Sequence, residues 1–262
     1  MTQPMPERPS SQSEELSARS VRSVSAERWR EAQQWELGLW QEGQRKRGWK
    51  RIVWPVVAPV LRAVKWPRGW GDDWNVWWKD QFDGYSFLPV RLGDALELGC
   101  GPYTNMRLIL KGRQASRVVC SDPLVKSYIT FRGRWLAEAY AQGRVEIDDH
   151  PIEETPFMPE SFDLVVMINV LDHVRDADMC LRRAIELVRP GGYFLIGQDL
   201  SDARDIAFHP HDIGHPIRLR REDLEPYLEV LATALRKDLA REEGRDPRLH
   251  YGTLVYAGMK QR

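Results

Sequence analysis

Two groups of residues in this chain have types and spacings that could do chemistry. The first is a glycine turn, Gly99-Cys100-Gly101, which follows the apolar run 95–98. Glycine has no Cβ atom, so this turn can be tight and a ligand can approach the main chain closely. The second group is the histidines, with His173 followed by a histidine-rich segment at 209–215. The imidazole pKa suits proton removal near neutral pH, so these residues are candidate bases.

The residues after the turn limit the cofactor that it could hold. A dinucleotide-binding turn would have a third glycine where this chain has Thr104, and the lysine and hydroxyl residue of a Walker loop are absent. A second apolar run ends at Asp122, roughly 20 residues on from Gly99, the spacing that places an acid on a ribose hydroxyl. The pattern favours a nucleoside cofactor without a pyrophosphate.

Five motifs in the right order resemble those of the class I S-adenosylmethionine-dependent methyltransferases. They are the turn at 97–101, Asp122, and the runs 151–157, 161–165 and 188–193. The resemblance implies that the backbone of Gly99, Cys100 and Gly101 cradles the methionine part of S-adenosylmethionine, with Glu97 supporting that end. It also implies that Asp122, followed by Pro123, binds the ribose.

The adenine position is less regular. Family members often carry an aspartate where this chain has Pro151. We expect adenine to contact the backbone of Ile152 and one of the two side chains just upstream, Asp149 or His150. Asn169 resembles the position whose backbone faces the amino group of the cofactor.

Methyl transfer from a sulfonium mainly requires an aligned acceptor and removal of its proton. His173, preceded by Asp172, follows a predicted strand into the cleft and is a candidate base, although methyltransferases with unrelated substrates carry a histidine here. The segment 209–216 could be a substrate loop, a metal site or a polar loop without chemistry. The spacing of its histidines and aspartate matches no standard metal site, so we predict no metal-ligand residues. A divalent ion would have no recognisable site in this sequence. We expect His209 and His211 to contact the acceptor, and His215 to be a second candidate base.

The N-terminal part of the chain is rich in aromatic and basic residues. Ten of the eleven tryptophans precede residue 92, and residues 44–71 contain eight Lys or Arg and no acid. These residues could cover the cofactor cleft, stack on sugar rings or lie on an anionic membrane surface. Stacked nucleobases are a further option, but no nucleic-acid-binding motif accompanies them.

The stretches 77–85 and 121–124 resemble methyltransferases of polysaccharide synthesis, in particular the sugar O-methyltransferases of the methylmannose polysaccharide pathway. We therefore expect O-methylation of a sugar hydroxyl in an oligosaccharide, with Trp78 and Tyr85 closing over the acceptor. The alternatives are a lipid-linked or small-molecule acceptor at a membrane surface, and a non-catalytic binding module.

Composition limits the remaining options. The formal net charge is zero, which gives no global field for nucleic acid, and the three cysteines form no C-x-x-C motif. No signal peptide or membrane-spanning run is present in the sequence, so we expect a cytoplasmic protein without stable membrane insertion. A homodimer is compatible with these features.

The elements that must position these residues alternate between strand and helix. Strands are predicted near 94–98, 116–121, 144–148, 163–169, 192–199 and 253–260, and helices near 104–112, 124–141, 176–189 and 220–228. Such alternation indicates a doubly wound, mostly parallel α/β sheet with helices on both faces. In residues 230–240 the composition favours a helix, but the resemblance implies a strand, which we adopt to give a Rossmann-like sheet of seven strands.

The predicted domain organisation has three parts. Residues 1–25 are a disordered tail, 26–91 a helical tryptophan-rich cap that helps to bind substrate, and 92–262 the methyltransferase domain. Within the cap, a helix is predicted over 26–44, with Trp29, Gln33, Leu37 and Trp40 on one face. A second helical piece is predicted within 52–64, limited by prolines.

Overall fold

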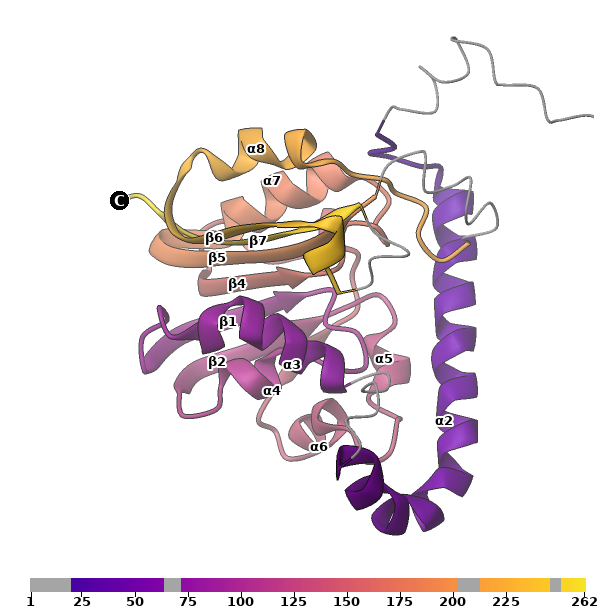
Figure 1. Cartoon of the computed structure of the whole chain (residues 1–262). Coiled ribbons are helices and arrows are strands. Elements are labelled where there is room, and N and C mark those ends of the chain that lie inside the picture. The colour runs from indigo at the N-terminus through magenta and orange to yellow at the C-terminus, as the bar shows by residue number, and fades with distance from the viewer. Residues whose placement is uncertain (1–19, 64–71, 202–212, 246–250) are drawn as a thin grey trace, which may run out of the picture.

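Figure 1 shows the computed structural model of the chain. It describes residues 20–63, 72–201, 213–245 and 251–262, with the backbone alone for 45–63 and 72–74. His209, His211 and residues 1–19 lie outside the described residues.

A seven-stranded sheet forms the centre of the molecule, in the order β3-β2-β1-β4-β5-β7-β6. The strands are β1 (Arg91–Leu98), β2 (Gln114–Ser121), β3 (Glu146–Asp148), β4 (Phe162–Ile168), β5 (Val188–Leu200), β6 (Leu231–Ala240) and β7 (Gly252–Lys260). Strands β1 to β5 pair in parallel, and β7 is antiparallel to both β5 and β6. The predicted fold class is confirmed, including the strand over 230–240.

The central strands are buried on both faces, as a parallel sheet covered by helices requires. The last four residues of β1 and the last five of β4 are all buried. Two hydrophobic clusters result, one on each face of the sheet. Helices α7 (Ala177–Leu187) and α8 (Arg221–Leu228) cover one face, and α3 (Asp72–Gln81) and α4 (Met106–Ile109) cover the other (Figure 1).

Two predicted helices are shorter than expected. The helix predicted over 104–112 is limited to α4, and the chain turns at Gly112, whose φ is +78°. The helix predicted over 124–141 is divided into α5 (Val125–Tyr128) and α6 (Trp135–Ala141), with Gly133 at φ +70° between them. In both places a glycine in the left-handed region ends or interrupts the helical run.

The N-terminal helix α2 (Ala26–Ala63) is longer than expected and continuous. The prediction of two separate pieces is therefore wrong, because helical backbone continues through Pro55 and Pro59. In Figure 1, α2 runs past the carboxyl ends of the strands, and its last turns curve below the sheet in this view. None of the helices in the described part of the chain combines the length and the apolar composition that a membrane span requires.

The end of the predicted tail is paired with the domain. The Val21 amide donates to the Arg218 carbonyl at 2.8 Å, and the Val24 amide donates to the Arg175 carbonyl at 2.9 Å. These bonds attach the start of α2 to the loops that follow β4 and precede α8. The position of α2 against the sheet is thus fixed at its N-terminal end.

Candidate active site

The glycine turn lies at the carboxyl end of β1. Gly99 and Gly101 have φ of +64° and +53°, and the Cys100 amide donates to the Ser121 carbonyl at 3.0 Å. A Cβ atom on Gly99 would lie 2.4 Å from Cγ1 of Val170, so this position must be glycine. A Cβ atom on Gly101 would meet nothing within 4 Å. The turn therefore packs on the loop after β4 with one glycine and presents open backbone with the other.

Asp122 closes the other side of this turn. Its Oδ2 accepts from the Gly101 amide at 3.0 Å, and its Oδ1 accepts from the Leu124 amide at 2.8 Å. Each carboxylate oxygen keeps a lone pair for a further hydrogen bond. Burial and the negative charge of Glu36 raise the pKa of Asp122 to about 7. A direct hydrogen bond thus joins the predicted turn to the predicted ribose-binding acid.

Glu97 supports the turn from within the core. Its carboxylate accepts from the Asn105 amide and side chain at 2.9 Å each, and from the Thr104 hydroxyl. Burial raises the pKa of Glu97 against the lowering effect of these bonds. Its role in this structure is to hold the loop 101–106. The thiol of Cys100 is buried, and burial raises its pKa.

The predicted adenine residues follow the carboxyl end of β3. His150 pairs with Asp148 at 2.7 Å, and Asp149 pairs with Lys126, which lowers the pKa of Asp149. Ile152 is buried in the core cluster that contains α7. Asp148 was not predicted, although its place at the end of an expected strand is the signal that could have found it.

Two further predicted cofactor positions lie on the same edge of the sheet. Pro123 is half-buried directly after Asp122. Asn169 has φ of +56°, and its amide donates to the Gly197 carbonyl at 2.6 Å. A non-glycine residue in the left-handed region is uncommon, and Asn is among the residues that tolerate it best.

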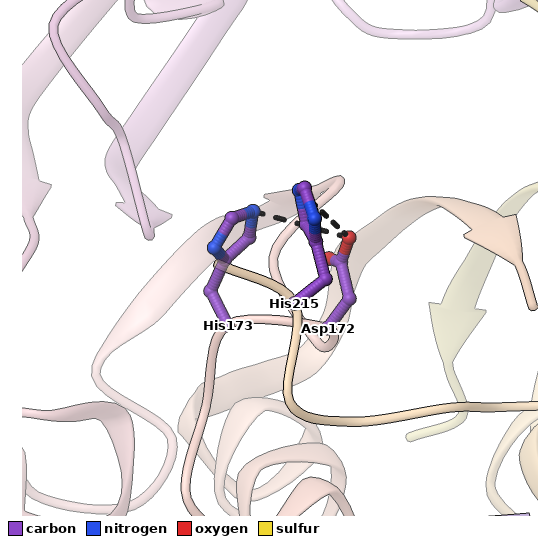
Figure 2. Close-up of side chains that lie close together, drawn as sticks. All are labelled: Asp172, His173 and His215. Atoms are coloured by element: carbon purple, nitrogen blue, oxygen red, sulfur yellow. Dashed lines mark ion pairs between the residues drawn. The ribbon is translucent and has the colours of Figure 1, made fainter. Parts of the chain in front are cut away.

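Three side chains, two from the loop after β4 and one from the segment before α8, meet in Figure 2. Oδ2 of Asp172 lies 3.9 Å from Nε2 of His173 and 4.0 Å from Nε2 of His215. The two imidazole rings cross at 61° with their centroids 4.6 Å apart. The Gln198 side chain donates to Oδ1 of Asp172 at 3.2 Å, and the Ile217 amide donates to its carbonyl. All three residues predicted for catalysis are therefore brought together.

Helix α2 adds a carboxylate that the sequence analysis missed. Oε2 of Glu36 lies 3.4 Å from Nδ1 of His173. Its Oε1 accepts from the Trp40 indole at 3.1 Å and from the Tyr128 hydroxyl at 3.2 Å. Glu36 could have been found from its helical spacing, because it shares the face of α2 that carries Gln33 and Trp40.

The predicted face of α2 packs on the loop after β4. The indole of Trp29 donates to the His173 carbonyl at 3.0 Å, and the Gln33 amide donates to the same oxygen at 3.4 Å. Trp40 lies against Tyr103, with ring centroids 5.5 Å apart. The helix therefore contacts both Tyr103, just after the glycine turn, and His173.

Two predicted acceptor contacts lie in the core instead. Trp78 is buried against Gly197, where a Cβ atom would come within 2.6 Å of its ring. Tyr85 is fully buried and stacks on Phe82. Their aromatic surface is used in packing, so in this structure neither side chain is available to an acceptor.

Comparison with known proteins is consistent with this geometry. Residues 96–196 match the family model described as "Methyltransferase domain". A probable S-adenosylmethionine-dependent methyltransferase of Mycolicibacterium smegmatis is 29% identical over 60% of this chain and 58% of its own length. The 27-O-demethylrifamycin SV methyltransferase of Amycolatopsis mediterranei is 27% identical over 44% of this chain and 42% of its own. The chain thus spans about half the length of these curated relatives.

A solved structure has the same fold. The geranyl diphosphate C-methyltransferase of Streptomyces coelicolor, in complex with Mg²⁺, geranyl diphosphate and S-adenosyl-L-homocysteine, superposes with a TM-score of 0.55 at 14% identity. The match covers 71% of this chain and 78% of that one. At this identity the likeness shows the fold alone, so the reaction has to be inferred from the residues of the site.

Proposed function

The chain carries a class I methyltransferase domain of the S-adenosylmethionine-dependent kind, and we propose that it transfers a methyl group to a hydroxyl of a small-molecule acceptor. The observation that carries the proposal is the contact between the two halves of the site. The glycine turn that would hold the donor packs on Val170, two residues before the Asp172–His173 pair. A base and a methyl donor would therefore share one edge of the sheet.

The residues present fit S-adenosylmethionine. Gly101 offers backbone with room where its side chain would be, and the buried carboxylate of Asp122 lies beside it. We assign the methionine part to the turn 99–101, the ribose to Asp122, and adenine to the region 149–152. When bound, the cofactor supplies a methyl group on a sulfonium, and its transfer breaks the carbon–sulfur bond and leaves the electron pair on sulfur.

The protein must supply the group that removes the acceptor proton. A hydroxyl is a poor nucleophile until a base takes its proton, and His173 and His215 are the candidate bases. Each faces Asp172 with Nε2, and His173 faces Glu36 with Nδ1. These carboxylates would orient the imidazoles and stabilise the positive charge that forms on proton transfer.

For the acceptor we propose a sugar hydroxyl, in an oligosaccharide such as a mannoside. The Trp40–Tyr103 pair beside the site supports a ring-shaped acceptor, because aromatic faces pack well on apolar ring surfaces. The name of the rifamycin relative supports a polyketide hydroxyl as the competing class. Buried free thiols at Cys100, Cys120 and Cys180 support a reducing, cytoplasmic setting.

The test combines binding and turnover. Calorimetry should show binding of S-adenosylmethionine that Asp122→Asn weakens by at least tenfold, and Glu138→Gln, at an exposed position on α6, should leave unchanged. Methyl transfer from a labelled donor is then screened over oligosaccharides, phenols and polyketide alcohols. His173→Ala and His215→Ala, assayed separately, should lower turnover at saturating cofactor. Absence of cofactor binding would overturn the proposal. Wild-type rates in both histidine variants would show that neither histidine is the base.

A further inference from the structure

We propose that Asp172, His173 and His215 bind a divalent first-row transition-metal ion. The evidence that the ion binds is the geometry of these three side chains alone. Its role in the reaction rests on the proposed function, since it would lie where the acceptor hydroxyl is deprotonated.

The spacing of the ligand atoms fits a site that closes on an ion. One ligand atom from each residue can be chosen so that all three lie within 4.8 Å of one another. Bonds of about 2.1 Å to one ion place neighbouring ligand atoms roughly 3.4 Å apart in tetrahedral geometry. The observed 3.9 and 4.0 Å to Oδ2 of Asp172 are longer by about half an ångström, which small side-chain rotations can remove.

The ligand types indicate which ions fit. Two imidazoles and one carboxylate suit Zn²⁺, Fe²⁺, Co²⁺ or Mn²⁺, whereas Mg²⁺ and Ca²⁺ prefer oxygen ligands throughout. Three protein ligands leave at least one coordination position open, as in catalytic rather than structural sites. That open position is where an acceptor oxygen would bind.

The surrounding contacts are those that metal ligands usually have. Oδ1 of Asp172 accepts from Gln198, and Oδ2 is the oxygen that faces both histidines, at 3.9 and 4.0 Å. Nδ1 of His173 is buried and makes no hydrogen bond, with Glu36 3.4 Å away. An ion on Nε2 would fix the proton on Nδ1, which could then donate to Glu36. Glu36 would then be the outer partner of this ligand, as carboxylates often are for metal-bound histidines.

The two segments that supply the ligands are already fixed beside each other. The Ile217 amide donates to the Asp172 carbonyl at 3.3 Å, and the Arg218 guanidinium donates to the His215 carbonyl. The ion therefore needs no rearrangement of the backbone, only the closing of three side chains.

An ion at this position changes the assignment of the base. As a Lewis acid it would lower the pKa of a bound acceptor hydroxyl, and the proton would pass to a solvent water molecule. The acceptor oxygen would then form its bond to the methyl carbon while the carbon–sulfur bond breaks and sulfur keeps the electron pair. His173 and His215 would hold the ion rather than take the proton.

The test uses Co²⁺ and Zn²⁺ on the full chain after treatment with a chelator. Titration with Co²⁺ should give visible absorption bands that saturate at one ion per chain, and Zn²⁺ should displace it. Asp172→Asn and His215→Ala should each weaken Co²⁺ binding by at least tenfold, and Glu36→Gln should weaken it by a smaller factor. His150→Ala, which removes a half-exposed histidine paired with Asp148, is the matched control and should bind Co²⁺ like the wild type.

The outcomes separate this inference from the proposed function. Circular dichroism of each variant first confirms that it is folded. Wild-type protein that binds no Co²⁺, or ligand variants that bind it unchanged, would overturn the ion site. Methyl transfer by protein shown to bind no ion would overturn the ion site and retain the proposed function. Ion binding without methyl transfer to any acceptor would retain the site and count against the function.

Discussion

At the scale of single residues, the ionisation of Asp122 should control cofactor binding. Its pKa is raised to about 7, first by burial and then by Glu36. The ribose needs a carboxylate that accepts hydrogen bonds, so affinity for S-adenosylhomocysteine should fall roughly tenfold from pH 8 to pH 6. Calorimetry across this range should show the fall in the wild type and none in Asp122→Asn. Glu36→Gln should move the midpoint to lower pH, and His150→Gln should not.

The same carboxyl should affect stability with a defined sign. Its pKa is about 7 in the folded chain and about 3.9 when unfolded, so the folded state binds more protons between these values. Its contribution to stability therefore decreases as the pH rises through this window. The melting temperature of Asp122→Asn relative to wild type should be higher at pH 8 than at pH 5. The opposite trend would show that the carboxylate is stabilised in the folded protein.

The residues at strand ends could be predicted, and those of the covering helix only in part. Gly99, Gly101 and Asp122 follow apolar runs, and parallel strands bring their carboxyl ends to one edge. Glu36 depends on how α2 lies against that edge, which local spacing does not determine. Trp78 has an aromatic ring that suits a sugar or a core equally well, and only the close approach of Gly197 decides between them.

At the scale of elements, the contact of α2 with the loop after β4 should contribute measurably to stability. The Trp29 indole donates to the His173 carbonyl at 3.0 Å. Trp29→Phe keeps most of the ring and removes this donor, so it should cost about 1 kcal/mol. The melting temperature should fall by roughly 2–4 °C. Trp35→Phe is the matched control, because Trp35 is 40% exposed, and it should have a smaller effect. Equal shifts would place the contribution in the aromatic rings rather than in the hydrogen bond.

Helices and strands were predicted correctly where an apolar run of the right length was bounded by turn residues. β1 and β4 were predicted because buried parallel strands are continuous apolar runs. β6 has a composition that favours a helix, but pairing with β7 overrides that preference. The length of α2 could not be predicted, since prolines inside a helix are unfavourable and local rules end the helix before them.

At the scale of the whole molecule, α2 connects the two halves of the site. Glu36 contacts Tyr128 on α5, just after Asp122, and also faces His173 beyond β4. Cofactor bound at the glycine turn should therefore stabilise α2 and the histidine loop as well as its own contacts.

Amide hydrogen exchange measures this connection directly. Saturating S-adenosylhomocysteine should slow exchange in residues 29–40 and 169–176, as well as at 97–105 and 122–124. Helix α8 is the internal control, because it packs on α7 on one face of the sheet, and its exchange should not change. In Glu36→Gln the slowing at 169–176 should shrink while that at 97–105 remains, because the link is lost and the glycine turn is intact. Protection confined to 97–105 and 122–124 in the wild type would mean that the cofactor and acceptor sides act independently.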